Sequence, residues 1–150
     1  MMSFQVETWD RVRNEASVLW ADHFQEVGQD PKRMPLNPDL MKCAKLASLG
    51  MLHIVTARKD GVLVGYHASI IDNLLHYRTT LAANSDLYWL APPYRNGRNA
   101  LRLFQKVEET CRARGVEILY DATKVYLDRG ELFEHLGYKL IEKRYSKRIA

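Results

Sequence analysis

A polar segment with two arginines and one glycine lies between a predicted strand and a predicted helix. It reads Leu90-Ala91-Pro92-Pro93-Tyr94-Arg95-Asn96-Gly97-Arg98-Asn99-Ala100. The free backbone N–H groups at a helix start, together with the positive end of the helix dipole, favour phosphate oxygens. Arg95 and Arg98 add donors for charge-assisted hydrogen bonds. The segment therefore predicts a site for a phosphate-bearing ligand; the alternative is a plain strand-to-helix connection whose arginines face water.

The elements that position this segment follow from hydrophobic periodicity. Two helices come first, over 9–27 and 38–49, and each ends at a glycine. Three strands are predicted next, over 52–57, 62–71 and 81–90, and a hairpin-type turn at 59–61 joins the first two. A helix over 100–114, a buried strand over 116–120, a helix over 128–136 and a final strand over 139–149 complete the order. This order predicts one α+β (mixed α/β) domain over 1–150, with a mostly antiparallel sheet of about six strands flanked by helices.

Length and composition limit the class of protein. The chain has 150 residues, 47% of them hydrophobic and 27% charged, which is typical of one folded domain. No run approaches the roughly 20 apolar residues of a membrane span, and the first residues lack the apolar centre of a signal peptide. Two distant cysteines, Cys43 and Cys111, favour a reduced, cytoplasmic protein. The histidines show no ligand spacing, so no metal is expected.

Two motifs resemble those of the GNAT N-acyltransferases. The polar segment resembles the family's acetyl-CoA-binding pattern Val-x-Pro-x-Tyr-Arg followed by x-x-Gly-x-Gly/Ala, except that Arg98 stands at the central glycine and Gly97 lies one place earlier. The stretch Leu132-Phe133-Glu134-His135-Leu136-Gly137-Tyr138 resembles the family's Leu-Tyr-Glu-Lys-Leu-Gly-Phe. The pattern is also similar to a phage- and prophage-encoded group, in Asp86, Thr123-Lys124, Asp128-x-Gly130 and the terminal Glu142-x-x-Tyr145-x-Lys147.

The resemblance implies an N-acetyltransferase that uses acetyl-CoA as co-substrate and transfers the acetyl group to an amine by direct attack. It implies a GNAT-like domain in which two strands separate near Leu90, so that a backbone N–H there polarises the thioester carbonyl. The cofactor-binding residues that it implies run along the polar segment: Leu90, Ala91, Arg95, Asn96, Gly97, Arg98, Asn99 and Ala100. In a phage, the protein would work in the host cytoplasm.

Direct transfer needs a base for the amine and an acid for the departing thiolate. Asp86 is the first candidate for the base, because residues 86, 88 and 90 share one face of a regular strand; its alternative is a turn cap, and His67 is a rival. The family's usual acid is a tyrosine at the position of Phe133, which has no hydroxyl. We therefore assign the acid to Tyr126, with Tyr88 or a water as alternatives.

The acceptor amine is open to a small molecule, a protein lysine or a modified base. Two further functions compete with the enzyme: a GNAT-like binding module without catalysis, favoured by Phe133 and by the glycine lost at Arg98, and a basic protein that acts on nucleic acid or a host protein. The net charge of +4 and a basic C-terminal group favour the last, although such a group is typical of a solvated strand face. The predicted C-terminal strand pairs across a homodimer axis or covers the chain's own core.

Overall fold

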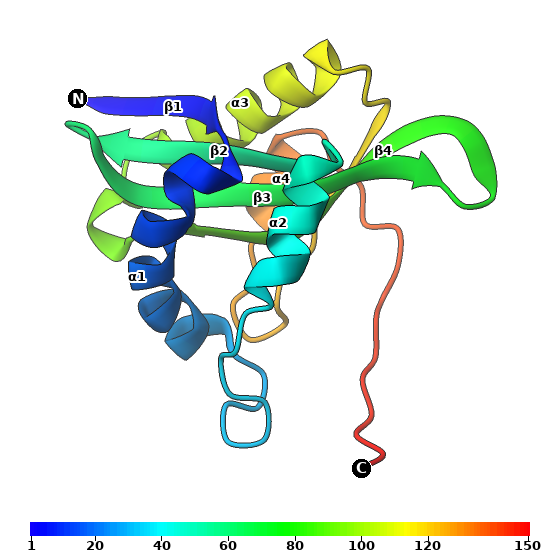
Figure 1. Cartoon of the computed structure of the whole chain (residues 1–150), viewed down its shortest axis with the longest axis horizontal. Helices are drawn as coiled ribbons and strands as arrows, with labels where there is room; N and C mark the ends of the chain where they lie inside the picture. The colour runs from blue at the N-terminus through cyan, green and yellow to red at the C-terminus, as the bar shows by residue number, and fades with distance from the viewer.

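The computed structural model describes all residues, 1–150, and has a single five-stranded sheet (Figure 1). The strands are β1 (Met2–Glu7), β2 (Leu52–Lys59), β3 (Val62–Leu74), β4 (Tyr77–Leu90) and β5 (Ile118–Tyr120). The helices are α1 (Trp9–Val27), α2 (Leu40–Ser48), α3 (Asn99–Ala113) and α4 (Gly130–His135), with a 3₁₀ turn at Pro92–Tyr94. The spatial order is β1-β2-β3-β4-β5; the first four strands are antiparallel, and β5 runs parallel to β4. The predicted α+β class is confirmed, with one strand fewer than expected.

Side chains of successive strand residues point to opposite faces of the sheet, and each face is covered by helices. Ile54 of β2 packs with α1, in a cluster that also holds Leu63, Tyr66, Trp89 and, from the helix, Trp9, Val12, Ala16 and Trp20. Its neighbour Val55 packs on the other face, in a cluster with Ile71, Ala83 and, from α3, Leu103, Val107 and Cys111. The helical stripes predicted from spacing are therefore the residues that fix α1 and α3 to the sheet.

Two strands differ from the sequence-based prediction. β1 was not predicted, because its six residues are too few for a clear alternation and Val6 is half exposed. It pairs with β2, Met2 opposite Lys59 and Glu7 opposite Ile54. The strand at 116–120 was predicted to be buried on both faces, but β5 is only three residues long and Ile118 is 38% exposed. β5 is instead an edge strand that covers only a short stretch of β4.

The predicted strand over 139–149 is wrong. These residues form no strand, and Figure 1 shows the C-terminal segment leaving the body of the protein as an extended arm. We call residues 139–150 the C-terminal arm. Its four large apolar side chains do not cover the core, since they are 69–90% exposed: Leu140, Ile141, Tyr145 and Ile149. Strand-forming residue types need a neighbouring strand for their backbone hydrogen bonds, and the single chain supplies none here.

Two buried histidines predict how stability depends on pH. His23 bonds the hydroxyl of Tyr66 at 2.8 Å, His53 bonds that of Thr110 at 3.0 Å, and burial lowers both pKa values to about 4. Because unfolded histidine titrates near pH 6.5, protons bind the unfolded state first as the pH falls. The stabilisation that comes from keeping these two histidines neutral is therefore complete above about pH 6.5. We expect the melting temperature to fall progressively between pH 6.5 and 4.5.

Thermal melts at constant ionic strength check this expectation. The double variant His23→Gln, His53→Gln is expected to show a flatter profile in that window, whatever its stability at pH 7. Carboxylates lose their stabilising charge only at lower pH, so they do not account for a loss above pH 5. An equally steep profile in the double variant would contradict the assignment.

Candidate active site

Strand β4 extends well beyond its neighbour β5. β5 pairs only with residues 82–84, whereas β4 continues to Leu90. The Ala91 N–H donates to the Val64 carbonyl at 2.8 Å, so the alternation of the ladder turns the N–H and C=O of Leu90 away from β3. We call the uncovered edge of β4, residues 85–90, the β4–β5 gap. It presents backbone hydrogen-bonding groups to whatever lies beside it.

The N-terminus of α3 lies directly after the loop that follows this gap. Gly97 has φ +59°, and a Cβ there would meet no atom within 4 Å, so the left-handed backbone rather than space requires glycine. No side chain caps the helix, and its first backbone bond joins the Arg102 N–H to the Arg98 carbonyl at 2.9 Å. The N–H groups of residues 99–101 therefore lack backbone acceptors, which suits an anion.

The two predicted phosphate-binding arginines have different surroundings. Arg95 faces inward: its Nε donates to the Leu90 carbonyl at 2.6 Å, and its Nη2 pairs with Glu26 at 2.8 Å. Burial raises the pKa of Glu26, but the hydrogen bond and the charge of Arg95, with smaller contributions from Trp89 and Arg129, together lower it, so the pair is ionic. Arg98 is exposed and has no ion-pair partner. Arg95 thus ties the loop to α1 and to the gap, and Arg98 is the arginine available to a ligand.

Asp86, the predicted base, lies at a β-bulge in β4. Leu87 pairs with Ala68 and Ser85 pairs with Ser69, so Asp86 is the extra residue and is exposed. The bulge breaks the regular alternation, and the expectation that residues 86, 88 and 90 share one face is wrong. The carboxylate lies near α2, where it adds to burial in raising the pKa of the Cys43 thiol. Asp86 therefore lies on the side of β4 that faces α2.

The two candidate acids, Tyr126 and Tyr88, and the phenylalanine at the family's usual acid position lie in three different environments. Tyr126 is 55% exposed in the loop before α4, and its hydroxyl donates to the Val27 carbonyl at the end of α1, at 2.6 Å. Tyr88 donates to the Ala122 carbonyl at 2.7 Å, and burial raises its pKa to about 12. Phe133 is buried against Phe104 and Tyr88. Of the two tyrosines, Tyr126 has the more accessible hydroxyl, and no hydrogen bond joins it to Asp86.

The structure also brings together groups that the sequence did not mark as a unit. His67, a rival base in the sequence, is 1% exposed and bonds Asp121 at 2.8 Å, so it is closed to a substrate. Tyr138 donates to the second oxygen of Asp121, also at 2.8 Å. One feature of the sequence could have indicated Asp121: it is a carboxylate directly after a predicted strand, and ligand-binding sites often lie at the carboxyl ends of parallel strands. Glu26, the partner of Arg95, had no signal beyond its place on a helix.

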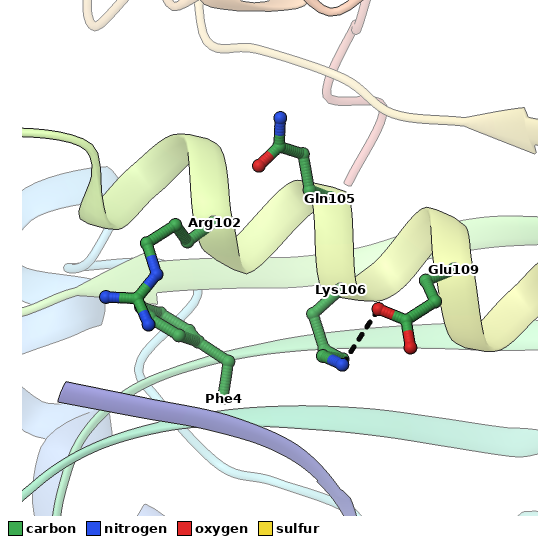
Figure 2. A pocket seen from close by; sticks show the side chains of 5 residues that line it. All are labelled: Phe4, Arg102, Gln105, Lys106 and Glu109. Carbon is green, nitrogen blue, oxygen red and sulfur yellow. Dashed lines mark hydrogen bonds and ion pairs between the residues drawn. The ribbon is translucent and has the colours of Figure 1, made fainter.

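A hollow of 340 Å³ lies between β1 and α3 (Figure 2). The guanidinium of Arg102 lies over the ring of Phe4, 4.8 Å from its centre, and Lys106 pairs with Glu109 at 2.8 Å. These charged side chains already interact with neighbouring side chains, and they lie on an open surface. The hollow has no unpaired backbone edge and is a weaker candidate than the β4–β5 gap. No group of three or more metal-ligating side chains occurs, and no helix is long and apolar enough to span a membrane.

No protein-family model and no curated protein matches the sequence. Solved structures do match over the full chain. They include a ribosomal-protein-alanine N-acetyltransferase from Brucella melitensis biovar Abortus, with 19% identity and a TM-score of 0.74 over 100% of both chains. An aminoglycoside acetyltransferase from an uncultured soil metagenomic sample has 15% identity and a TM-score of 0.77, over 100% of this chain and 99% of that one. A predicted acetyltransferase from Clostridium acetobutylicum, solved with acetyl-CoA, has 10% identity and a TM-score of 0.74, over 99% and 96%.

These neighbours share the order and arrangement of elements across essentially the whole chain, at identities of 10–19%. Likeness at that level concerns the fold. The five-stranded mixed sheet, its separation after residue 84 and the uncapped start of α3 agree with it. The chain therefore has the GNAT fold found in N-acetyltransferases.

Proposed function

We propose that this chain is an acetyl-CoA-dependent N-acetyltransferase. The observation that carries the proposal is that backbone N–H groups without backbone acceptors lie in two neighbouring places: the Leu90 N–H at the edge of β4 and the N–H groups of residues 99–101 at the start of α3. An extended ligand with amides at one end and phosphates at the other matches these two places in order. Pantetheine and pyrophosphate are such a pair, and several structural neighbours contain acetyl-CoA or CoA.

In this proposal the chain holds the pyrophosphate at residues 97–101. The uncapped N–H groups and the helix dipole favour the negative charge, and Arg98 adds a mobile cation. Arg95 acts on the ligand only through the loop, because its guanidinium is held by Glu26 and the Leu90 carbonyl. Asn99 supports the same loop by donating from its side chain to the Tyr94 carbonyl at 3.0 Å.

The chemistry assigns one task to each candidate. The Leu90 N–H, which the ladder turns into the gap, donates to the thioester oxygen and stabilises the charge that develops there. Asp86 accepts the proton of the amine as its nitrogen attacks the carbonyl carbon. The carbon–sulfur bond then breaks, and Tyr126 donates its proton to the thiolate. Both side chains border the α1–α2 side of the sheet, where an acceptor would enter.

A binding module without catalysis is the second candidate function. Phe133 favours it, because the position that carries a hydroxyl in many GNAT enzymes here holds a ring packed among Tyr88, Phe104 and Tyr138. The two functions share the CoA site and differ in turnover. Release of free CoA in the presence of an amine separates them.

Two classes of acceptor amine should be tested first. Structural neighbours include enzymes named for aminoglycosides and for a ribosomal-protein alanine. A screen should therefore pair aminoglycosides with peptides that begin with alanine, and lysine peptides should be added. The readout is CoA release, followed by the 5-thio-2-nitrobenzoate that the free CoA thiol displaces from 5,5′-dithiobis(2-nitrobenzoate), and confirmed by the mass of the acetylated product.

Thermal melting with and without acetyl-CoA tests the binding site. At about 100 times its dissociation constant, a ligand adds roughly 2.7 kcal/mol to a two-state fold, so the parent is expected to melt at a clearly higher temperature. Gly97→Val is expected to remove this shift, since a β-branched side chain resists φ +59° and distorts the loop.

Gly61→Val is the matched control for this experiment. Gly61 also has a positive φ, +85°, with no atom within 4 Å of an added Cβ, but it lies in the β2–β3 turn. Its substitution should lower stability similarly and leave the acetyl-CoA shift intact. If the parent melts cooperatively and shows no shift at millimolar acetyl-CoA, the proposed function is wrong.

A further inference from the structure

The chain that leaves β5 is held by side chains from three other places in the fold. The Nε2 of His67, on β3, bonds Oδ1 of Asp121 at 2.8 Å. The hydroxyl of Tyr138, after α4, donates to Oδ2 of the same carboxylate at 2.8 Å. The hydroxyl of Tyr88, on β4, donates to the Ala122 carbonyl at 2.7 Å. Residues 121–122 are therefore fixed at the point where β5 ceases to follow β4.

The bond between His67 and Asp121 crosses one face of β4. In the sheet order β4 lies between β3 and β5, yet His67 of β3 reaches Asp121 beyond the end of β5. The ring of His67 stacks on Tyr88 at 6.1 Å between centres and meets the edge of Phe104, from α3, at 5.3 Å. The bond thus runs along the α3 face of the sheet. It holds Asp121 on that face, directly after the last residue of β5.

Both ends of the bond are closed to solvent. The side chains of His67 and Asp121 are each 1% exposed. Burial raises the pKa of Asp121, but the hydrogen bonds from His67 and Tyr138 outweigh it and the pKa is lowered, so the carboxylate is charged and fully partnered. The second ring nitrogen of His67 lies 3.3 Å from the Ser69 hydroxyl. Neither residue can touch a substrate, so any effect on function must act through the position of the backbone.

We propose that His67, Asp121 and Tyr88 form a brace that holds the β4–β5 gap open before acetyl-CoA binds. The inference rests on the proposed function and assigns three positioning residues to it. Unpaired backbone groups at a sheet edge favour pairing with any nearby strand. Continuing the register of β4 with β5, in which Asn84 lies opposite Tyr120, would carry residues 121–126 along residues 85–90. With the brace in place β5 cannot extend in this way, and the gap is formed in advance.

Two substitutions of one residue separate positioning from mere packing. His67→Leu removes the donor to Asp121, whereas His67→Gln keeps an amide N–H close to the position of Nε2. If the open gap falls to about a tenth of molecules without the brace, acetyl-CoA binds about tenfold more weakly. We therefore expect a dissociation constant raised about tenfold in His67→Leu and raised less than about threefold in His67→Gln.

Tyr66→Phe is the matched control, because Tyr66 is the neighbouring residue on β3 and faces the opposite side of the sheet. Its hydroxyl bonds His23 and is buried, so its loss should lower the melting temperature without changing acetyl-CoA affinity. Calorimetric titration measures the affinities. Equal affinity in His67→Leu and His67→Gln, or an equal loss in Tyr66→Phe, would overturn the brace.

Amide exchange in the free protein tests the brace without any ligand. In His67→Leu the Leu90 amide is expected to exchange about tenfold more slowly than in the parent, because the closing gap gives it a partner. Unchanged or faster exchange would overturn the proposal. A parent that binds no acetyl-CoA would refute the proposed function, and the exchange comparison would still decide for or against the brace.

Discussion

Replacing Asp86 with asparagine is expected to lower the turnover number 100-fold or more while leaving acetyl-CoA affinity unchanged. General-base catalysis typically contributes about 10²–10⁴-fold, and an amide of the same shape cannot accept the proton. The residue stands at a bulge, which projects an exposed carboxylate beside α2 instead of into the sheet face. CoA release with the best acceptor from the amine panel gives the turnover, and calorimetry gives the affinity.

Asp72→Asn provides the control for this prediction. Asp72 is an exposed carboxylate on β3, in the part of the hairpin that extends away from the gap. Its loss changes the net charge equally and should not alter turnover. A second check is pH: if Asp86 is the base, raising the pH should partly restore the variant, since more acceptor amine is then unprotonated. Full activity of Asp86→Asn would remove the residue from the mechanism.

Replacing Arg58 with alanine is expected to lower the free energy of unfolding by about 3–5 kcal/mol, the usual cost of breaking a buried ion pair. The Arg58 guanidinium bonds Glu7 at 2.9 Å, Glu15 at 2.8 Å and the Gly61 carbonyl at 2.8 Å. It thereby joins β1, α1 and the β2–β3 turn. Urea unfolding at pH 7 measures the loss.

The reason for so large a loss is the carboxylate that remains. The side chain of Glu7 is 2% exposed, and its pKa is lowered because the bonds from Arg58 outweigh the opposing effect of burial. In the parent, the stabilisation is present above the unfolded pKa near 4.5 and is lost as the pH falls below it. Without Arg58 the pKa of Glu7 should rise, so the variant should become relatively less unstable in acid.

Arg11→Ala is the comparison for this experiment. Arg11 also pairs with Glu7, at 2.6 Å, but its side chain is 67% exposed, so water screens the pair. Its loss should cost less than about 1 kcal/mol. Similar losses in the two variants would show that burial does not set the strength of this network.

Elements with long periodic patterns were predicted closely. α1 was predicted over the residues it occupies, because its stripe of Trp9, Val12, Ala16 and Trp20 is ended by Gly28. The turn at Asp60-Gly61 was also predicted, and both residues have positive φ. The predictions for β1 and for the C-terminal arm were wrong for the same physical reason. A short or mixed pattern becomes a strand only if a neighbour lies beside it, and one sequence does not record neighbours.

The site was predictable where it depends on local chemistry. The start of α3, Gly97 and the end of β4 follow from residue types at adjacent positions. The bulge at Asp86 was not, because it depends on the register between β3 and β4. The inward position of Arg95 depends on Glu26, which is 69 residues away in sequence. The bond from His67 to Asp121 likewise joins residues 54 positions apart.

The C-terminal arm also decides how the molecule behaves as a polyelectrolyte. The arm holds five of the chain's 22 lysines and arginines and one of its 18 acidic residues, so it carries the whole formal net charge of +4. The remaining 138 residues are neutral in sum. Retention on a cation-exchange column is thus a property of the arm. The pI of about 9.1 therefore describes a neutral folded domain with a basic C-terminal arm.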